Sequence, residues 1–226
     1  MVQNVFSNSI IRLTAIIFLF LITDLVWSGG ISRVKLNISH TELDRIYKNE
    51  IIPTKYTSIT GVGTEKLSDN LKGSLIFGYQ EQLQGENSIA AARYAVGYFG
   101  GLSVDYTIFK RNNFESSLLA KYQYHQLEGK EADQAVKITW YDITFGVENY
   151  YSLNNNIQLL ADVYSFKESG EERALEPLSQ LIHFENKSSI TYSLGIAYNL
   201  NSGGSFGVKW LNGAEQGFQL IFSGKI

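Results

Sequence analysis

The residues of this sequence that could do chemistry are carboxylates, lysines and three histidines. Much of the chain alternates between a large apolar residue and a small or polar one. Seven titratable residues fall at the small or polar positions, and these are Asp105, Lys121, His125, Asp142, Glu148, Asp162 and Lys209. Cysteine is absent from the 226 residues, which excludes disulfides, thiolate metal sites and a cysteine nucleophile. We predict no catalytic residue, no metal site and no cofactor.

Two pairs among these residues would interact if neighbouring strands carry them. Counting residues across the connections places Lys121 opposite Asp142, and Glu148 opposite Asp162. The first would be an ion pair, whereas the second would bring together two carboxylates that hold a proton or recruit a cation. The structural interpretation is a hydrogen-bonded network that fills the interior. The functional alternative is a narrow polar pore or a metal-binding interior.

Strands must position these residues, because the chain beyond residue 30 alternates with a period of two. In the clearest run, residues 93–109, large side chains such as Tyr98 and Val104 alternate with small ones such as Gly97 and Ser103. The same pattern recurs in residues 118–125, 141–148, 157–164 and 189–200. Each strand therefore has one apolar face and one face that is small, polar or charged.

The lengths of these strands favour a membrane barrel over a soluble β-sandwich. Several runs reach 12–17 residues, whereas strands of soluble proteins usually have about 5–6 residues and a tilted membrane strand needs about 9–11. The connections also alternate in length, as an up-and-down barrel requires. Short turns are expected at 67–71, 110–113, 153–156 and 201–204, and longer polar loops at 40–54, 83–92, 128–135 and 168–183. Residues 212–215 are the exception, because this connection is short where the alternation calls for a long loop.

The pattern predicts an all-β protein, a transmembrane up-and-down antiparallel β-barrel of ten strands. The expected strands are about 31–39, 55–66, 72–82, 93–109, 114–127, 136–152, 157–167, 184–200, 205–211 and 216–226. Ser39–Glu42 resembles a helix capping box, so a short helix is expected at about 40–49. Eight strands remain the alternative, if residues 31–66 form a plug or a periplasmic segment.

The N-terminus predicts export. Residues 13–23 form an apolar run of signal-peptide length, and residues 26–28 suit cleavage after Ser28. A spanning helix would need about 20 apolar residues and would include Asp24 at a cost of about 2.5–3.5 kcal/mol. We therefore assign residues 1–28 to a cleaved signal peptide and residues 31–226 to one barrel domain. An uncleaved inner-membrane anchor is the alternative.

Aromatic residues cluster near the expected ends of the strands. Amphipathic rings prefer the headgroup zones of a bilayer, so these residues predict two girdles. The girdle residues are Tyr79, Tyr94, Tyr106, Tyr124, Tyr141, Tyr151, Tyr198 and Trp210. Ordinary strand preference for aromatic residues is the alternative explanation.

The last strand carries the most recognisable feature, because Phe218, Leu220, Phe222 and Ile226 alternate back from the C-terminus. This arrangement resembles the C-terminal insertion signal of Gram-negative outer-membrane barrels, although such signals usually end in Phe or Trp. Together with the expected signal peptide and the alternation, residues 31–226 resemble the small outer-membrane β-barrel proteins of Gram-negative bacteria. The resemblance implies an outer-membrane location, with membrane lipid and the barrel assembly machinery as partners.

Three classes of function follow for such a barrel. The first is a structural or surface-interaction protein with a largely filled lumen, the second is a narrow channel for ions or small solutes, and the third is an outer-membrane enzyme such as a lipid A-modifying hydrolase. His40, His125 and His183 offer no Ser–His pairing typical of such hydrolases, and Asp133 with His183 is the best rim pair for a protease. We expect no enzyme. The net charge of -3 also excludes nucleic-acid binding through bulk positive charge, and the oligomeric state is not predicted.

Overall fold

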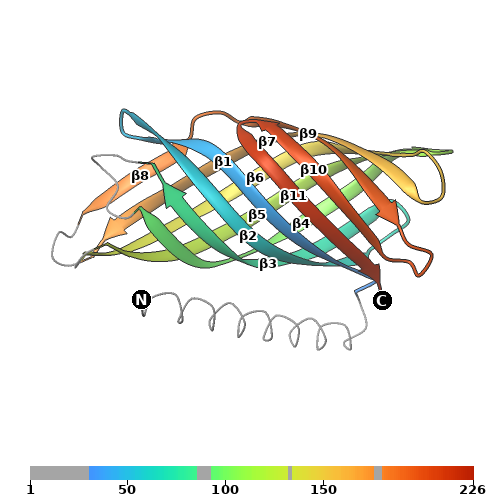
Figure 1. Ribbon diagram of the computed structural model, residues 1–226, viewed down its shortest axis with the longest axis horizontal. Coiled ribbons are helices and arrows are strands. Elements are labelled where there is room, and N and C mark those ends of the chain that lie inside the picture. Colours follow the sequence, from blue (N-terminus) through green and yellow to red (C-terminus); the bar gives the residue numbers. More distant parts are fainter. Residues whose placement is uncertain (1–30, 86–92, 132–133, 176–179) are drawn as a thin grey trace.

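A computed structural model of the protein describes residues 31–85, 93–131, 134–175 and 180–226, so the expected signal peptide lies outside the described residues. Eleven strands make up this part of the chain (Figure 1). They are β1 (Arg33–Tyr47), β2 (Glu50–Lys66), β3 (Leu71–Gln84), β4 (Tyr94–Arg111), β5 (Phe114–Glu131), β6 (Gln134–Ser152), β7 (Ile157–Ala174), β8 (Leu181–Asn186), β9 (Ile190–Asn199), β10 (Ser205–Gly213) and β11 (Glu215–Lys225). In this part of the chain, no helix is long and apolar enough to cross a membrane.

Ten of these strands close into a ring, which confirms the predicted antiparallel barrel. Neighbouring strands pair antiparallel from β1 to β7, and then β7 pairs with β9, β9 with β10 and β10 with β11. The ring closes because β11 pairs with β1 over a register that runs from Arg33 opposite Lys225 to Leu43 opposite Glu215. Closure leaves no unpaired sheet edge among the described strands, so their backbone groups can hydrogen-bond to one another without water.

The short strand β8 makes the barrel taper. At the end far from the C-terminus, β8 lies between β7 and β1, with Gly170 and Tyr47 both opposite Phe184 (Figure 1). Strands β9, β10 and β11 stop short of this end. β11 begins at Glu215, opposite Leu43 of β1, and β9 begins at Ile190, opposite Ser165 of β7. The ring therefore has eight strands, β1 to β8, at this end, which we call the narrow half, and ten strands in the remainder, which we call the wide half.

The apolar faces of the strands point outward. Leu194, Phe145 and Tyr98 are 70%, 60% and 57% exposed, whereas Asp162 and Lys209 on the opposite face are 2% and 6% exposed. A soluble sandwich would bury the first three residues instead. In the wide half, the strands are therefore apolar on the outside and polar on the inside, as predicted.

The apolar outer surface forms a belt that covers the wide half only. Along β1 the outward residues change from Val34, Leu36 and Ile38 to His40 and Glu42 over the last positions that pair with β11, just before the strand reaches β8. Several other strands change in a similar way, although Ile51, Leu83, Tyr94 and Leu181 are apolar and exposed at this end. The outward polar residues there include Lys55, Gln126, Glu128, Lys137, Lys167, Glu171 and Arg173. The outer surface of the narrow half is therefore suited to water.

The predicted helix at about 40–49 is wrong, because these residues continue β1 and then turn at Lys48 and Asn49 into β2. The period of two persists through Thr41, Leu43, Arg45 and Tyr47, which are all buried. Pairing with β2 satisfies the backbone along the whole segment, and the supposed cap hydroxyl of Ser39 instead hydrogen-bonds the hydroxyl of Ser58 at 2.7 Å. Local capping preference yields here to cross-strand pairing.

Three other expectations fail for a related reason. The plug that would reduce the barrel to eight strands is wrong, since β1 and β2 lie in the wall. The predicted long loops at 40–54, 128–135 and 168–183 are largely strand. The predicted strand 184–200 is two strands, β8 and β9, which both pair with β7 but have different second neighbours, β1 for β8 and β10 for β9. Polar, charged sequence suggested loops, but in the narrow half it is the water-facing side of long strands.

Candidate functional site

The lumen is divided into an open chamber and a filled region. The chamber is a cavity of about 1000 Å³ in the wide half, with walls rich in hydroxyl and amide side chains. Its mouth lies at the end where β1 begins and β11 ends, and the cationic residues at the mouth are Arg33, Lys66, Lys72, Lys110 and Lys225. Tyr56, Phe99, Trp140 and Phe166 form much of the opposite end of the chamber. Ten strands leave this space because the barrel diameter grows with strand number.

The narrow half is filled by its own side chains. An eight-stranded ring is just wide enough for inward side chains to occupy it fully. The apolar core there consists mainly of Leu43, Tyr47, Ile52, Tyr56, Leu127, Val136, Ile138, Trp140, Ile182 and Phe184, each 5% exposed or less. Gln84 adds a polar layer by donating hydrogen bonds to the Tyr47 hydroxyl at 3.1 Å and to Glu172 at 3.0 Å. This packing closes the lumen.

Arg45 is the centre of the filled region. Its guanidinium is fully buried, donates a hydrogen bond to Glu168 in an ion pair, and donates another to Gln82 Oε1 at 2.8 Å. Three rings surround it, with centroids 3.9 Å away for Phe184, 4.5 Å for Trp140 and 5.3 Å for Tyr56. Cation–π attraction and the ion pair together offset the cost of removing this charge from water.

His125 lies between the filled region and the chamber. Its ring stacks between Phe99 at 4.9 Å and Trp140 at 4.4 Å. Nε2 is hydrogen-bonded to Asp142 at 2.8 Å and Nδ1 to Gln80 at 3.0 Å. Both ring nitrogens thus have partners in the described structure, which leaves neither of them directed at a serine hydroxyl as a hydrolase would require.

The predicted ion pair between Lys121 and Asp142 is wrong by two residues. Lys121 lies opposite Thr144, and Asp142 lies opposite Gln123. The count assumed that the connection spans 128–135, whereas β5 and β6 pair as far as Glu131 opposite Gln134. The shift brings Asp142 beside His125 instead, an interaction that the sequence count missed.

Glu148 lies directly opposite Asp162, as the count across the shorter turn predicts. The two carboxylates nevertheless have separate partners. Asp162 Oδ2 accepts hydrogen bonds from Lys209 Nζ, the Ser193 hydroxyl and the Tyr164 hydroxyl, each at 2.6 Å, and Glu148 accepts one from Tyr150 at 2.8 Å. Lys209 therefore compensates the Asp162 charge, and the described residues contain no group of three or more His, Asp or Glu side chains placed to hold a metal ion.

The remaining residues of the expected interior network, Asp105 and Lys121, both line the chamber. Sequence reasoning missed several interior charges, among them Lys35, Arg45 and Glu168. Lys35 lies in a segment expected to be a short strand, Arg45 in the expected helix and Glu168 in an expected loop. The signal that could have found them is the uninterrupted alternation of Lys35, Asn37 and Ser39 into Thr41, Leu43 and Arg45.

The other candidate residues lie on the outside or beyond the described chain. His40 and His183 face outward on β1 and β8, and Asp133 lies outside the described residues. All eight girdle residues belong to outward faces, and Tyr124 and Tyr141 are the last apolar residues before Gln126 and Thr139. Phe218, Leu220 and Phe222 face outward on β11, opposite His40, Ile38 and Leu36, while Ile226 follows the strand.

Comparisons with known proteins concern the fold. No family model and no curated protein matches the sequence. Solved structures that it resembles include the outer-membrane protease OmpT from Escherichia coli, with 10% identity, coverage of 88% of this chain and 97% of that chain, and a TM-score of 0.48. The β domain of the Bordetella autotransporter BrkA has 7% identity, 87% and 98% coverage, and a TM-score of 0.48. Ail of Yersinia pestis has 9% identity, 86% and 98% coverage, and a TM-score of 0.41 in its complex with a heparin analogue.

These identities are too low to carry any activity to this chain. The assignment of the architecture therefore rests on the closed antiparallel ring, the outward apolar belt and the enclosed polar residues. These are the defining features of a barrel that crosses a lipid bilayer with its strands. The chain has the fold of a Gram-negative outer-membrane β-barrel protein.

Proposed function

We propose that this protein is a non-conducting outer-membrane barrel that acts through the water-facing outer surface of its narrow half. The apolar belt of the wide half would lie in the bilayer, and the polar strands of the narrow half would project beyond it. Short turns and both ends of outer-membrane barrels lie on the periplasmic side. The narrow half, at the opposite end, therefore projects outside the cell.

The observation that carries this proposal is the filled ring around Arg45. Arg45, Tyr47, Leu127 and Ile138 are each 0% exposed, and they extend from three strands, β1, β5 and β6, into the same core. A conducting pore would need a continuous aqueous path through this layer. Packing of this density favours the surface-interaction role over the channel role.

Export and assembly belong to the same proposal. Residues 1–28 would direct the chain across the inner membrane and be removed. The outward Phe218, Leu220 and Phe222 of β11 would be read by the barrel assembly machinery before β11 pairs with β1 and closes the ring. Membrane lipid would then contact the belt and its aromatic girdles.

Outer-membrane location can be tested directly. We expect the protein to sediment with outer-membrane markers, and we expect its gel mobility to differ between unheated and boiled samples, because a closed barrel resists detergent unfolding. Recovery in the soluble periplasmic fraction, with the same mobility before and after boiling, would show that the belt does not lie in a bilayer.

Conductance of purified protein in a planar bilayer tests closure. We expect no stable single-channel steps from the wild type, and stable steps from the triple variant Arg45→Ala/Trp140→Ala/Phe184→Ala, because it removes the ring stack that fills the lumen. Trp210→Ala is the matched control, since it removes the same ring type from the lipid-facing side of β10, and it should stay silent. Single Trp140→Ala covers the case in which the triple variant does not fold. Steps from the wild type would overturn the proposal in favour of the channel alternative.

A further inference from the structure

We propose that the chamber of the wide half binds a small zwitterionic solute, whose carboxylate is held by Lys35 and whose ammonium is held by Asp105. This site is independent of the proposed surface role, because it lies in the other half of the barrel and opens toward the other side of the membrane. The proposal depends on charges that the barrel holds apart, on unpaired acceptors in the chamber wall and on the charge of the mouth.

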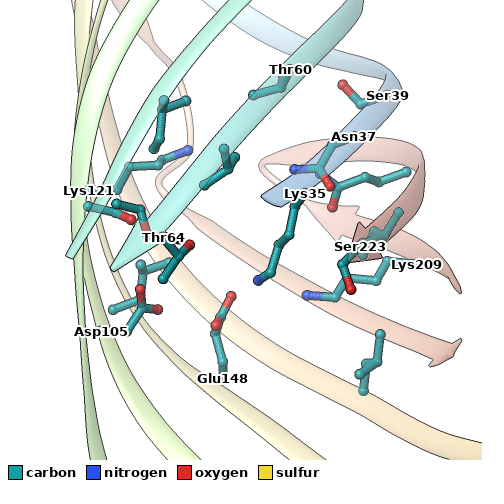
Figure 2. A pocket seen from close by; sticks show the side chains of 18 of the residues that line it. Lys35, Asn37, Ser39, Thr60, Thr64, Asp105, Lys121, Glu148, Lys209 and Ser223 are labelled. Carbon is teal, nitrogen blue, oxygen red and sulfur yellow. Dashed lines mark hydrogen bonds between the residues drawn. The ribbon is translucent and has the colours of Figure 1, made fainter. Parts of the chain in front are cut away.

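Lys35 and Asp105 are opposite charges that face the same space without touching. Figure 2 shows both directed into the chamber, with Lys209 and Glu148 nearby. Neither Lys35 nor Asp105 makes an ion pair or hydrogen bond within the described part of the chain, whereas Lys209 pairs with Asp162 and Glu148 accepts from Tyr150. A molecule with one charge of each sign completes both interactions at once.

The chamber wall also has acceptors that need donors. Asn37 Oδ1 and Asp142 Oδ1 are buried and have no hydrogen-bond partner among the described residues. Both residues line the chamber, and Asn37 lies two positions from Lys35 on the same face of β1. A buried acceptor that has no donor destabilises the folded protein. Asn37 lies beside Lys35 and Asp142 beside His125, so these acceptors add to the polarity of the wall, and the ammonium group, which carries three donors, is assigned to Asp105.

The positive charges at the mouth of the chamber favour entry of the solute with its carboxylate first. Lys72 and Lys110 share Glu115 at 3.5 and 2.9 Å, and Lys66 pairs with Asp69 at 2.8 Å. Among the described residues, the other two cationic side chains at the mouth are Arg33 and Lys225, which lie directly opposite each other on β1 and β11. Two like charges in this position repel unless an anion comes between them, and their field attracts carboxylates.

The volume of the chamber suits the same class of ligand. Pockets for small molecules enclose about 300–1,000 Å³, and this one has about 1000 Å³. Ser39, Thr60 and Ser223 are among the hydroxyl residues that line it (Figure 2). Such a wall can solvate a polar backbone between two charged ends.

Calorimetry on the refolded full barrel in detergent would test the proposal with three probes of equal chain length. These are 4-aminobutyrate, which has both charges, butyrate, which has only the acid, and butylamine, which has only the amine. We expect 4-aminobutyrate to bind at least about tenfold more tightly than either, a difference of about 1.4 kcal/mol. Equal binding of butyrate would make the chamber a plain anion site, and absence of 4-aminobutyrate binding would reject the site altogether; either result overturns the proposal.

Substitutions locate the binding. Lys35→Gln and Asp105→Asn should each abolish the preference for 4-aminobutyrate, whereas Lys35→Arg should retain it. Lys55→Gln is the matched control, because Lys55 lies on the outer surface in an exposed pair with Glu42 at 3.5 Å. Heat-modifiable gel mobility reports whether each variant has folded. If the preference persists in both folded variants, Lys35 and Asp105 do not hold the solute. None of these outcomes depends on conductance or on the surface role of the narrow half.

Discussion

Replacing Glu168 with glutamine should destabilise the folded barrel by about 3–5 kcal/mol, because it leaves Arg45 as an uncompensated buried charge. Arg45 is 0% exposed and Glu168 3% exposed, and together they lie in the core of the narrow half. The amide can still accept a hydrogen bond, so the expected loss reports mainly on charge. Urea unfolding of the protein in lipid vesicles would measure it as a lower midpoint.

Glu171→Gln is the matched control for this prediction. Glu171 lies on the same strand and pairs with Arg173 at 3.5 Å, but both side chains are exposed. Exposed pairs contribute about 0–1 kcal/mol, so this variant should be close to the wild type. The double variant Arg45→Met/Glu168→Gln should recover much of the lost stability, since it removes both charges and keeps the volume. A Glu168→Gln variant as stable as Glu171→Gln would show that the narrow half does not depend on this ion pair.

Leu194→Arg should oppose membrane insertion by about 2–4 kcal/mol, the cost of an arginine on the lipid face near the bilayer midplane. Leu194 is the central outward residue of β9 and is 70% exposed. Its neighbour Ser193 is 3% exposed and faces the lumen. The free energy of folding into vesicles, measured by urea titration, should therefore fall strongly in this variant.

Leu181→Arg provides the comparison for Leu194→Arg. Leu181 is also an exposed, outward leucine, so the substitution is the same. It lies on β8 in the narrow half, outside the belt. We expect a change there within about 1 kcal/mol, because arginine remains in water or at the interface. Equal losses at the two positions would mean that the belt does not mark the bilayer.

The taper gives the two halves of one barrel different physical properties. Eight strands bring the walls close enough for Arg45 and its surrounding rings to fill the lumen, whereas ten strands leave a chamber lined by Lys35, Asp105 and Lys121. The change occurs where β8 replaces β9 to β11 between β7 and β1. The described strands thereby combine a filled end and an open chamber.

The alternation of residues 93–109 was sufficient to predict which side of β4 faces lipid, because side-chain direction in a strand follows from local geometry alone. The ends of strands were harder to predict. Charged residues such as Glu168 and Arg173 suggested a loop, but they are inward and outward residues of a strand that continues beyond the belt. Composition reports exposure to water, and it does not distinguish a loop from the water-facing side of a strand.

The sequence by itself determined the antiparallel membrane barrel, the apolar outer face and the enclosed polar face, because these follow from period, strand length and turn spacing. Only the tertiary structure decided the taper, the closed narrow half and the partners of the interior charges. Arg45 and Glu168 are 123 residues apart and meet through closure of the ring. A two-residue difference in one connection moved Asp142 from Lys121 to His125. Contacts across a barrel depend on register summed over many strands, and no local pattern encodes that sum.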